Sequence, residues 1–155
     1  MTQFKQRITP FLWFDQKAGE AAAFYTQLFP NSRVVEVKKY SETVKIYQIE
    51  LFGEAFTLME ASSHHAFNEA ISLAVECEDQ STIDHYWSEL TSLGGKASMC
   101  GWLKDRYGVS WQIVPTCLNQ FLADQDKTKA NRVMQAMLGM QKLDITALEY
   151  AYNDK

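Results

Sequence analysis

The sequence has neither a long apolar run nor a concentration of charge of one sign. No apolar stretch approaches the roughly 20 residues that a membrane-spanning helix needs. The net charge is −4, and runs of like charge extend over only a few residues. Recognition of a nucleic-acid backbone requires a basic stripe, which this chain lacks. We therefore expect no membrane span and no nucleic-acid partner.

Cysteine is scarce in this chain. The three cysteines, Cys77, Cys100 and Cys117, are widely spaced and form no CxxC pair. This pattern does not predict a disulfide framework, and it favours a reducing, cytoplasmic location. The segment MTQFKQRITPF has no apolar stretch of the kind that a secretory signal carries. Cys77 and Cys117 fit as small core residues, whereas Cys100 is a candidate to face a pocket.

The chain does contain enough apolar material to build a core, since 46% of its 155 residues are hydrophobic and 13% are aromatic. In the first half, the apolar run at residues 8–14 predicts a strand. The apolar spacing of residues 22–29 predicts an amphipathic helix that stops at Pro30. Three strand-like runs follow, at residues 33–40, 44–52 and 55–60.

The second half repeats this order of elements. Residues 71–77 predict a strand, Asp79 opens a helix, and Gly94-Gly95 is the expected end of that helix. Three short strands follow, at residues 96–99, 101–104 and 109–114.

Two local patterns support this reading of the second half. The last two strands are joined by Asp105-Arg106-Tyr107-Gly108, a hairpin turn in which Gly108 takes the positive φ. The helical segments FYTQLF (residues 24–29) and YWSELT (residues 86–91) share their pattern of aromatic, polar and leucine positions. Both patterns favour a duplicated unit.

The tail of the chain breaks the repeat. Residues 130–138 carry an apolar, methionine-rich stripe at helical spacing, and Asp144 is the expected N-cap of a last helix. The stripe packs either on the same domain or on a second subunit. We predict an α+β fold in one domain, residues 1–155: a first βαβββ module at 5–62, a second at 68–118, and a helical C-terminal extension at 119–155.

Four segments together carry a family resemblance: ITPFLWFD…AAAFYTQLFPNS, FNEAISLAVECEDQ…DHYWSEL…GG, CGWLKDRYGVSWQIVP and RVMQAML…DI. They resemble the PhnB-like branch of the vicinal oxygen chelate superfamily, which also holds glyoxalases, bleomycin-resistance proteins and extradiol dioxygenases. The resemblance covers nearly the whole chain, including the helical tail. It implies two modules that curl their sheets around a cup, often completed across a homodimer.

Metal-using members of that superfamily place His or Glu ligands on four strands that face the cup. Carried over one at a time, these positions fall at about Thr9, at or near Glu60, at Ser72 and at Gln112. A divalent transition ion prefers His nitrogens, thiolates or carboxylates. Because only Glu60 belongs to these types, the resemblance implies a cup without metal, and we expect no cofactor.

We predict that the cup binds an aromatic or apolar small molecule that has a carbonyl or hydroxyl to orient. Strand alternation places Gln112 on the cup face and Trp111 on the helix-covered face. Glu60 is the one candidate for a general base. The expected lining consists of Thr9, Phe11, Trp13, Glu60, Ser72, Cys100, Trp102 and Gln112.

Other interpretations of these residues stay open. Gln112 can face outward on a half-exposed strand, and Glu60 can be a solvated residue at a strand end. The tryptophans can serve packing alone, and His64-His65 fit an exposed loop better than a metal pair. Asp105 and Gly108 have a sufficient role in the turn.

Three other functions also stay open, so the sequence does not decide whether the chain is an enzyme. Members of the branch are often labelled 3-demethylubiquinone-9 3-methyltransferase. A site for S-adenosylmethionine commonly needs a Gly-rich turn after a first parallel strand, and the chain has only seven glycines and no GxGxG. A metal-dependent lyase or dioxygenase needs the ligands that are missing. The third alternative is a dimer that binds no ligand.

Overall fold

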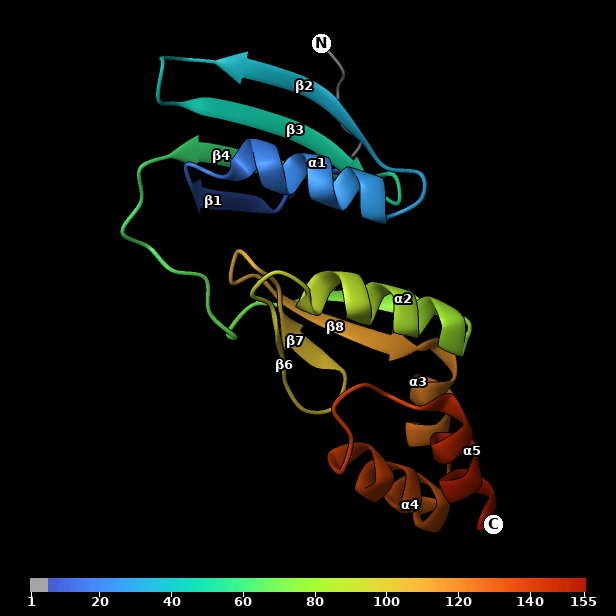
Figure 1. Ribbon diagram of the computed structural model, residues 1–155. Helices are drawn as coiled ribbons and strands as arrows, with labels where there is room; N and C mark the ends of the chain where they lie inside the picture. Colours follow the sequence, from blue (N-terminus) through green and yellow to red (C-terminus); the bar gives the residue numbers. More distant parts are fainter. Residues whose placement is uncertain (1–5) are drawn as a thin grey trace. The chain divides into compact units, whose positions relative to one another are not determined.

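The computed structural model describes residues 6–155, so residue 5, the expected start of the first module, lies outside the described part. The chain divides into two compact units, Met1–Ala66 and Phe67–Lys155. Each unit contains a four-stranded mixed sheet with one helix against it, and the second unit adds C-terminal helices (Figure 1). The predicted α+β fold of two βαβββ modules is confirmed.

The first unit follows the predicted order of elements. These are β1 (Phe11–Asp15), α1 (Ala18–Leu28), β2 (Arg33–Lys39), β3 (Lys45–Leu51) and β4 (Glu54–Ala61). The sheet order is β1-β4-β3-β2, with β1 parallel to β4 and the other pairs antiparallel. The β3–β4 connection is a two-residue turn in which Phe52 and Gly53 both have positive φ, the geometry that suits tight hairpins.

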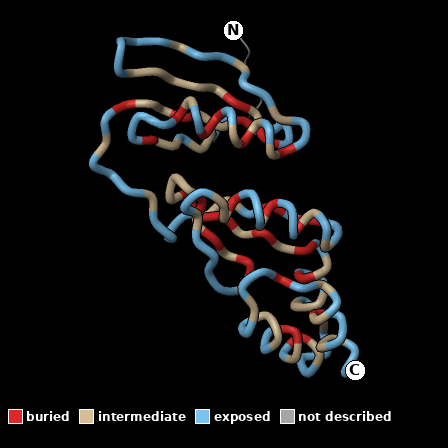
Figure 2. Tube along the Cα trace, in the orientation of Figure 1, coloured by how far each residue is buried: buried red, intermediate tan, exposed pale blue. Residues whose placement is uncertain are grey.

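Helix α1 covers one face of this sheet. Its buried residues are three alanines and Tyr25, which is 1% exposed. The centroid of the Tyr25 ring lies 6.4 Å from that of the Phe14 ring. Small side chains let the helix approach the sheet closely, above the buried residues Ile49 and Leu58. Among the described residues, no helix of this unit covers the opposite face of the sheet, which we call the first open face. Strand β2 at the edge of the sheet is mostly exposed (Figure 2).

Strand β1 begins later than the sequence indicated. The prediction was a strand from Ile8, but Ile8 is 88% exposed and precedes the sheet. Pro10 supplies a reason, because it has no N–H to donate and only accepts a hydrogen bond from Thr57. Thr9 therefore lies ahead of β1 rather than on it.

The second unit repeats the architecture. Its module consists of β5 (Leu73–Cys77), α2 (Gln80–Thr91), β6 (Lys96–Ala97), β7 (Trp102–Lys104) and β8 (Ser110–Pro115). The sheet order is β5-β8-β7-β6, with β5 parallel to β8. Helix α2 packs Ile83, Tyr86 and Leu90 against one face. The other face, which we call the second open face, carries Ser110 and Gln112, and the C-terminal helices pack on it at Val114.

Two boundaries in this unit differ from the prediction. The side chain of Asp79 caps α2 as expected, accepting from the Thr82 N–H, but the helix ends at Thr91 rather than at Gly94-Gly95. Leu93 has a positive φ and is 80% exposed, so it belongs to the turn after the helix. Strand β6 is only two residues long, because the chain leaves the sheet to form the tight turn at Cys100.

Three helices complete the second unit: α3 (Thr116–Leu122), α4 (Lys127–Leu138) and α5 (Ile145–Asn153). The sequence did not predict α3, which follows β8 directly. A buried cluster of Leu118, Val133, Leu143 and Leu148 joins the three helices, and Val114 of β8 packs against it. Asp144 caps α5 as predicted.

The methionine-rich stripe of α4 is divided between core and solvent. Ala130 and Val133 are buried, and Met137 is packed against the buried cluster. Met134 and Leu138 are 37% and 50% exposed. The helix thus packs on its own unit, which is the first of the two alternatives that the sequence left open. Part of its apolar stripe is still exposed.

Candidate functional site

Gln112 lies on the second open face. Its neighbours Trp111 and Ile113 are 2% and 0% exposed and face α2, whereas Gln112 is half-buried on the other side. Register places it between Ala74 on β5 and Trp102 on β7. The strand alternation predicted from the sequence is therefore correct.

The amide of Gln112 has a partner on the same face. Its Nε2 donates a hydrogen bond of 2.9 Å to the hydroxyl oxygen of Ser72, just before β5. Ser72 is one of the lining residues that the sequence analysis predicts. The bond fixes the orientation of the amide and leaves its carbonyl oxygen as an acceptor for another group.

A hollow of about 510 Å³ lies within the second unit, and neither Gln112 nor Ser72 is among its lining residues. Trp102 belongs to its lining and is also the register partner of Gln112, so the hollow and the amide share one face of the sheet. Cys100, the candidate pocket cysteine, lines it as well. The complete lining is Glu69, Lys96, Ala97, Ser98, Met99, Cys100, Trp102, Leu103, Lys104 and Ser110.

Two lysines, Lys96 and Lys104, line the hollow. Lys96 and Lys104 are directly paired in the β6–β7 register, so their side chains leave the sheet on the same side. The ammonium of Lys104 forms a 2.5 Å ion pair with Glu69, whose side chain is 65% exposed. This hydrogen bond lowers the pKa of Glu69 below its ordinary value.

The turn at Cys100 and Gly101 forms part of the wall. Both residues have positive φ, which is uncommon for a cysteine. Their N–H groups donate to the carbonyls of Met140 and Gln141, each at 2.8 Å. The segment between α4 and α5 therefore holds this turn in place.

The first open face carries two of the predicted lining residues. Phe11 and Trp13 pair in register with Thr57 and Met59, away from α1. Phe11 is 58% exposed, and the Trp13 indole donates to the Ala61 carbonyl. The ring of His65 lies 5.2 Å from that of Trp13, and both His64 and His65 are exposed.

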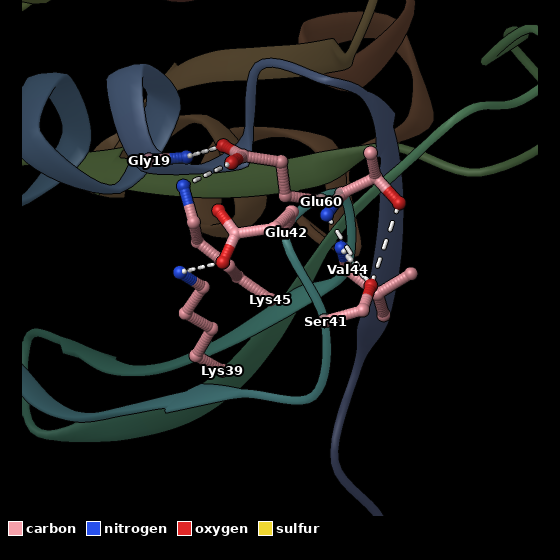
Figure 3. A network of polar contacts seen from close by, with 8 residues as sticks. Gly19, Lys39, Ser41, Glu42, Val44, Lys45 and Glu60 are labelled. Atoms are coloured by element: carbon pink, nitrogen blue, oxygen red, sulfur yellow. Dashed lines mark hydrogen bonds and ion pairs between the residues drawn. The ribbon is translucent and has the colours of Figure 1, made fainter.

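Glu60 lies on the other face of that sheet, which corrects its predicted position. It pairs in register with Phe14 and Lys45, on the side covered by α1. One carboxylate oxygen accepts from the Gly19 N–H at 3.0 Å and the other from Lys45 Nζ at 3.1 Å (Figure 3). This contact raises the pKa of Lys45 above its ordinary value.

The Glu60 cluster has a structural explanation. Gly19 lies in the first turn of α1, and Lys17 at the N-cap makes no side-chain capping bond. The Glu60 carboxylate takes that role from the neighbouring strand, where the positive end of the helix dipole favours a negative charge. Glu60 thus fastens helix to sheet, and its oxygens do not reach the open face.

The residues at the four carried-over positions do not fit a metal site. Ser72 and Gln112 are hydrogen-bonded to each other, and Glu60 is bound to Gly19 and Lys45. Thr9 precedes its strand. Among residues 6–155, no three His, Cys, Asp or Glu side chains gather closely enough to hold a metal ion.

All three cysteines are free thiols, and they differ in how deeply they are buried. Cys77 is 1% exposed, and burial raises its pKa to about 11. Burial also raises the pKa of the Cys117 thiol. Neither thiol is a nucleophile at neutral pH, because the thiolate is the reactive form.

One family profile matches this chain. It is described as 3-demethylubiquinone-9 3-methyltransferase, and it matches residues 6–114. The chain belongs to this family. A PhnB protein is among the relatives that are at least 30% identical, so the PhnB-like resemblance seen in the sequence is confirmed. The match ends at residue 114, near the end of β8, so the resemblance of the helical tail stays a prediction.

Solved structures agree with the family. A putative 3-demethylubiquinone-9 3-methyltransferase, PhnB protein, from Bacillus cereus is 34% identical, with a TM-score of 0.67, over 72% of this chain and 100% of the relative. The fosfomycin resistance protein FosX from Mesorhizobium loti is 13% identical, with a TM-score of 0.59, over 79% of this chain and 100% of that one. The second likeness shows the fold alone. No curated protein matches the chain.

Sequence reasoning for this PhnB-like protein missed the charges around the hollow. Lys96, Lys104 and Glu69 are ordinary surface residues in the sequence, and no motif singles them out. The sequence indicates the hairpin that joins their strands but not its register, which pairs Lys96 with Lys104 and brings two like charges together. Among the described residues, no helix is long and apolar enough to cross a membrane.

Proposed function

We propose that this PhnB-like protein binds a small aromatic or apolar molecule on its second open face, without a metal. Gln112 and Ser72 orient a carbonyl or hydroxyl of the ligand, and Trp102 supplies the apolar surface. The hollow beside them is of the size that small-molecule sites have, since these range from about 300 to 1,000 Å³.

The observation that carries this proposal is the Gln112–Ser72 hydrogen bond. An amide in the middle of an apolar strand costs stability unless it is paired, and here the pairing leaves an oriented acceptor beside an indole and a hollow. The predicted contributions of Thr9, Phe11 and Trp13 stay predictions. Glu60 is not included, because its carboxylate points to α1.

We also propose that the protein is a homodimer. The first open face exposes Phe11 and half-exposes Trp13 and Met59, and α4 exposes Met134 and Leu138. Apolar surface of this kind is typical of obligate interfaces, which are more apolar than the rest of a protein surface.

Methyl transfer, the activity in the family's description, has less support in this chain. Within the described residues each sheet has one parallel pair, at β1–β4 and β5–β8. S-adenosylmethionine sites with a Gly-rich turn belong to doubly wound parallel sheets, in which many parallel strands alternate with helices. Calorimetric titration with S-adenosylmethionine tests this alternative directly, and micromolar affinity would reinstate it.

The binding proposal is tested with 2-naphthamide, a neutral aromatic amide, titrated against the purified chain by calorimetry. Replacing Gln112→Leu removes the polar handle and keeps a similar volume, so we expect affinity to fall about tenfold. Gln27→Leu, on the exposed side of α1, is the matched control and should leave affinity unchanged. No binding to the unsubstituted chain at millimolar concentration, or equal binding by the Gln112→Leu variant, contradicts the proposal.

A further inference from the structure

The hollow of the second unit carries more positive charge than its own groups neutralise. Lys96 and Lys104 stand opposite each other on β6 and β7, an arrangement that is unfavourable for like charges. Glu69 neutralises Lys104. In the described part of the chain Lys96 forms no ion pair, so the hollow keeps one unmatched ammonium in a protein whose net charge is −4.

The positively charged groups of the hollow share one face of the sheet with an aromatic and an amide side chain. Trp102 and Lys104 alternate on β7, so the indole and the ammonium rise from the same face. Gln112 pairs with Trp102, and Ser110 pairs with Lys104. The second open face thus presents, in order, a hydrogen-bonded amide, an indole and an ammonium pair.

We infer that the ligand of this face is an amphipathic anion, an aromatic or apolar body that carries a carboxylate or a similar acidic group. The body lies on Trp102, the acidic group lies between Lys96 and Lys104, and a carbonyl or hydroxyl meets Gln112. This inference rests on the proposed function and adds the charge of the ligand to it.

Glu69 occupies the place of the ligand's acidic group when the hollow is empty. Its side chain is 65% exposed and comes from the segment that precedes β5, so little packing holds it there. An incoming carboxylate replaces it on Lys104 and gains Lys96 as a second partner. Glu69 therefore competes with an anionic ligand for Lys104. It weakens the binding of a neutral molecule less, because such a molecule forms no ion pair with Lys104.

The test uses a matched pair of probes, 2-naphthoate and 2-naphthamide, which differ only in the acidic group. We expect the unsubstituted chain to bind 2-naphthoate about fivefold more tightly, as one added ion pair at a partly exposed site provides. Lys96→Gln should abolish that preference. Glu69→Gln should tighten 2-naphthoate about threefold and leave 2-naphthamide unchanged. Lys38→Gln, on β2 of the other unit, is the control and should change neither.

The outcomes separate this inference from the proposed function. If neither probe binds, the proposed function fails. If both bind equally, or if Lys96→Gln keeps the preference, the site exists but its ligand is not an anion, and the inference is overturned. Circular dichroism of each variant checks that folding is intact, and all three substitutions lie at exposed or half-exposed side chains. Raising the salt concentration to 1 M should shrink the preference, because ions screen exposed charges.

Discussion

The indole nitrogen of Trp111 donates a 2.9 Å hydrogen bond to a carboxylate oxygen of Asp105, and both residues are 2% exposed. The other oxygen of Asp105 accepts from the N–H groups of Tyr107 and Val109. One carboxylate thus closes the β7–β8 turn and fixes the tryptophan that anchors β8 under α2. The amide of Gln112 faces the open side because its neighbour is held on the other.

Replacing Asp105→Ala should destabilise the protein by about 3 kcal/mol, because three donors lose a buried, charged acceptor. Urea unfolding followed by tryptophan fluorescence measures the change. Glu78→Ala, at an exposed carboxylate just before α2, should cost less than about 0.5 kcal/mol and serves as the control. A small effect at Asp105 would show that the turn holds without its carboxylate.

Replacing Glu60→Gln should lower stability by about 1 kcal/mol and leave ligand affinity unchanged. The substitution removes the charge at the N-terminus of α1 and the ion pair with Lys45, but no group on either open face. Thermal unfolding and titration with 2-naphthamide measure the two effects. Weaker binding with unchanged stability would return Glu60 to the site that the sequence assigned to it.

The two adjacent glycines after α2 should respond to alanine for different reasons. At Gly94 the φ is +102° and nothing lies within 4 Å of an added Cβ, so Gly94→Ala should cost only about 1 kcal/mol of backbone strain. At Gly95 the new Cβ would overlap the Leu90 carbonyl and lie 2.7 Å from the Thr91 Cα. Backbone cannot give way as a side chain can, so Gly95→Ala should cost more than about 2 kcal/mol. Equal losses in urea unfolding would contradict this ordering.

The protein should have twice the 17.8 kDa mass of one chain in solution. Light scattering coupled to size-exclusion chromatography at micromolar concentration measures the mass. Phe11→Ser together with Met134→Ser should shift the protein towards the monomer, because both side chains are exposed and apolar. A monomer mass for the unsubstituted chain refutes the proposed dimer.

The purified protein should carry no stoichiometric transition metal. The donors at the carried-over positions are an amide, two hydroxyls and a carboxylate that is already bound by Gly19 and Lys45. Elemental analysis by mass spectrometry tests this expectation. One zinc, nickel or iron per chain that is lost in a Gln112→Leu variant would overturn the metal-free proposal.

Local sequence signals predicted the elements well, because each had a short-range cause. Asp79 and Asp144 marked helix starts through caps, and Gly108 marked the hairpin through its positive φ. The signals failed where a neighbour decided the outcome. Helix α3 has no cap of its own and is held by the buried cluster around Leu118.

The candidate site was predictable only in part, for the same reason. Alternation along one strand sufficed for Gln112, since the large residues beside it had to be buried. The position of Glu60 was carried over from the resemblance, and the structure places it on the helix-covered face. Its strand end lies beside the first turn of α1, where a carboxylate is stabilised. The charges of the hollow depend on strand register, which the sequence does not specify for a strand as short as β6.

The hydrogen bonds from Cys100 and Gly101 to Met140 and Gln141 place part of the hollow's support outside the region that the family shares. The family profile ends at residue 114, and 72% of this chain already covers the whole Bacillus cereus relative. The helical tail therefore supports one wall of the hollow from outside the matched region. A change in the segment between α4 and α5 therefore moves this wall of the hollow through two backbone hydrogen bonds without altering any lining residue.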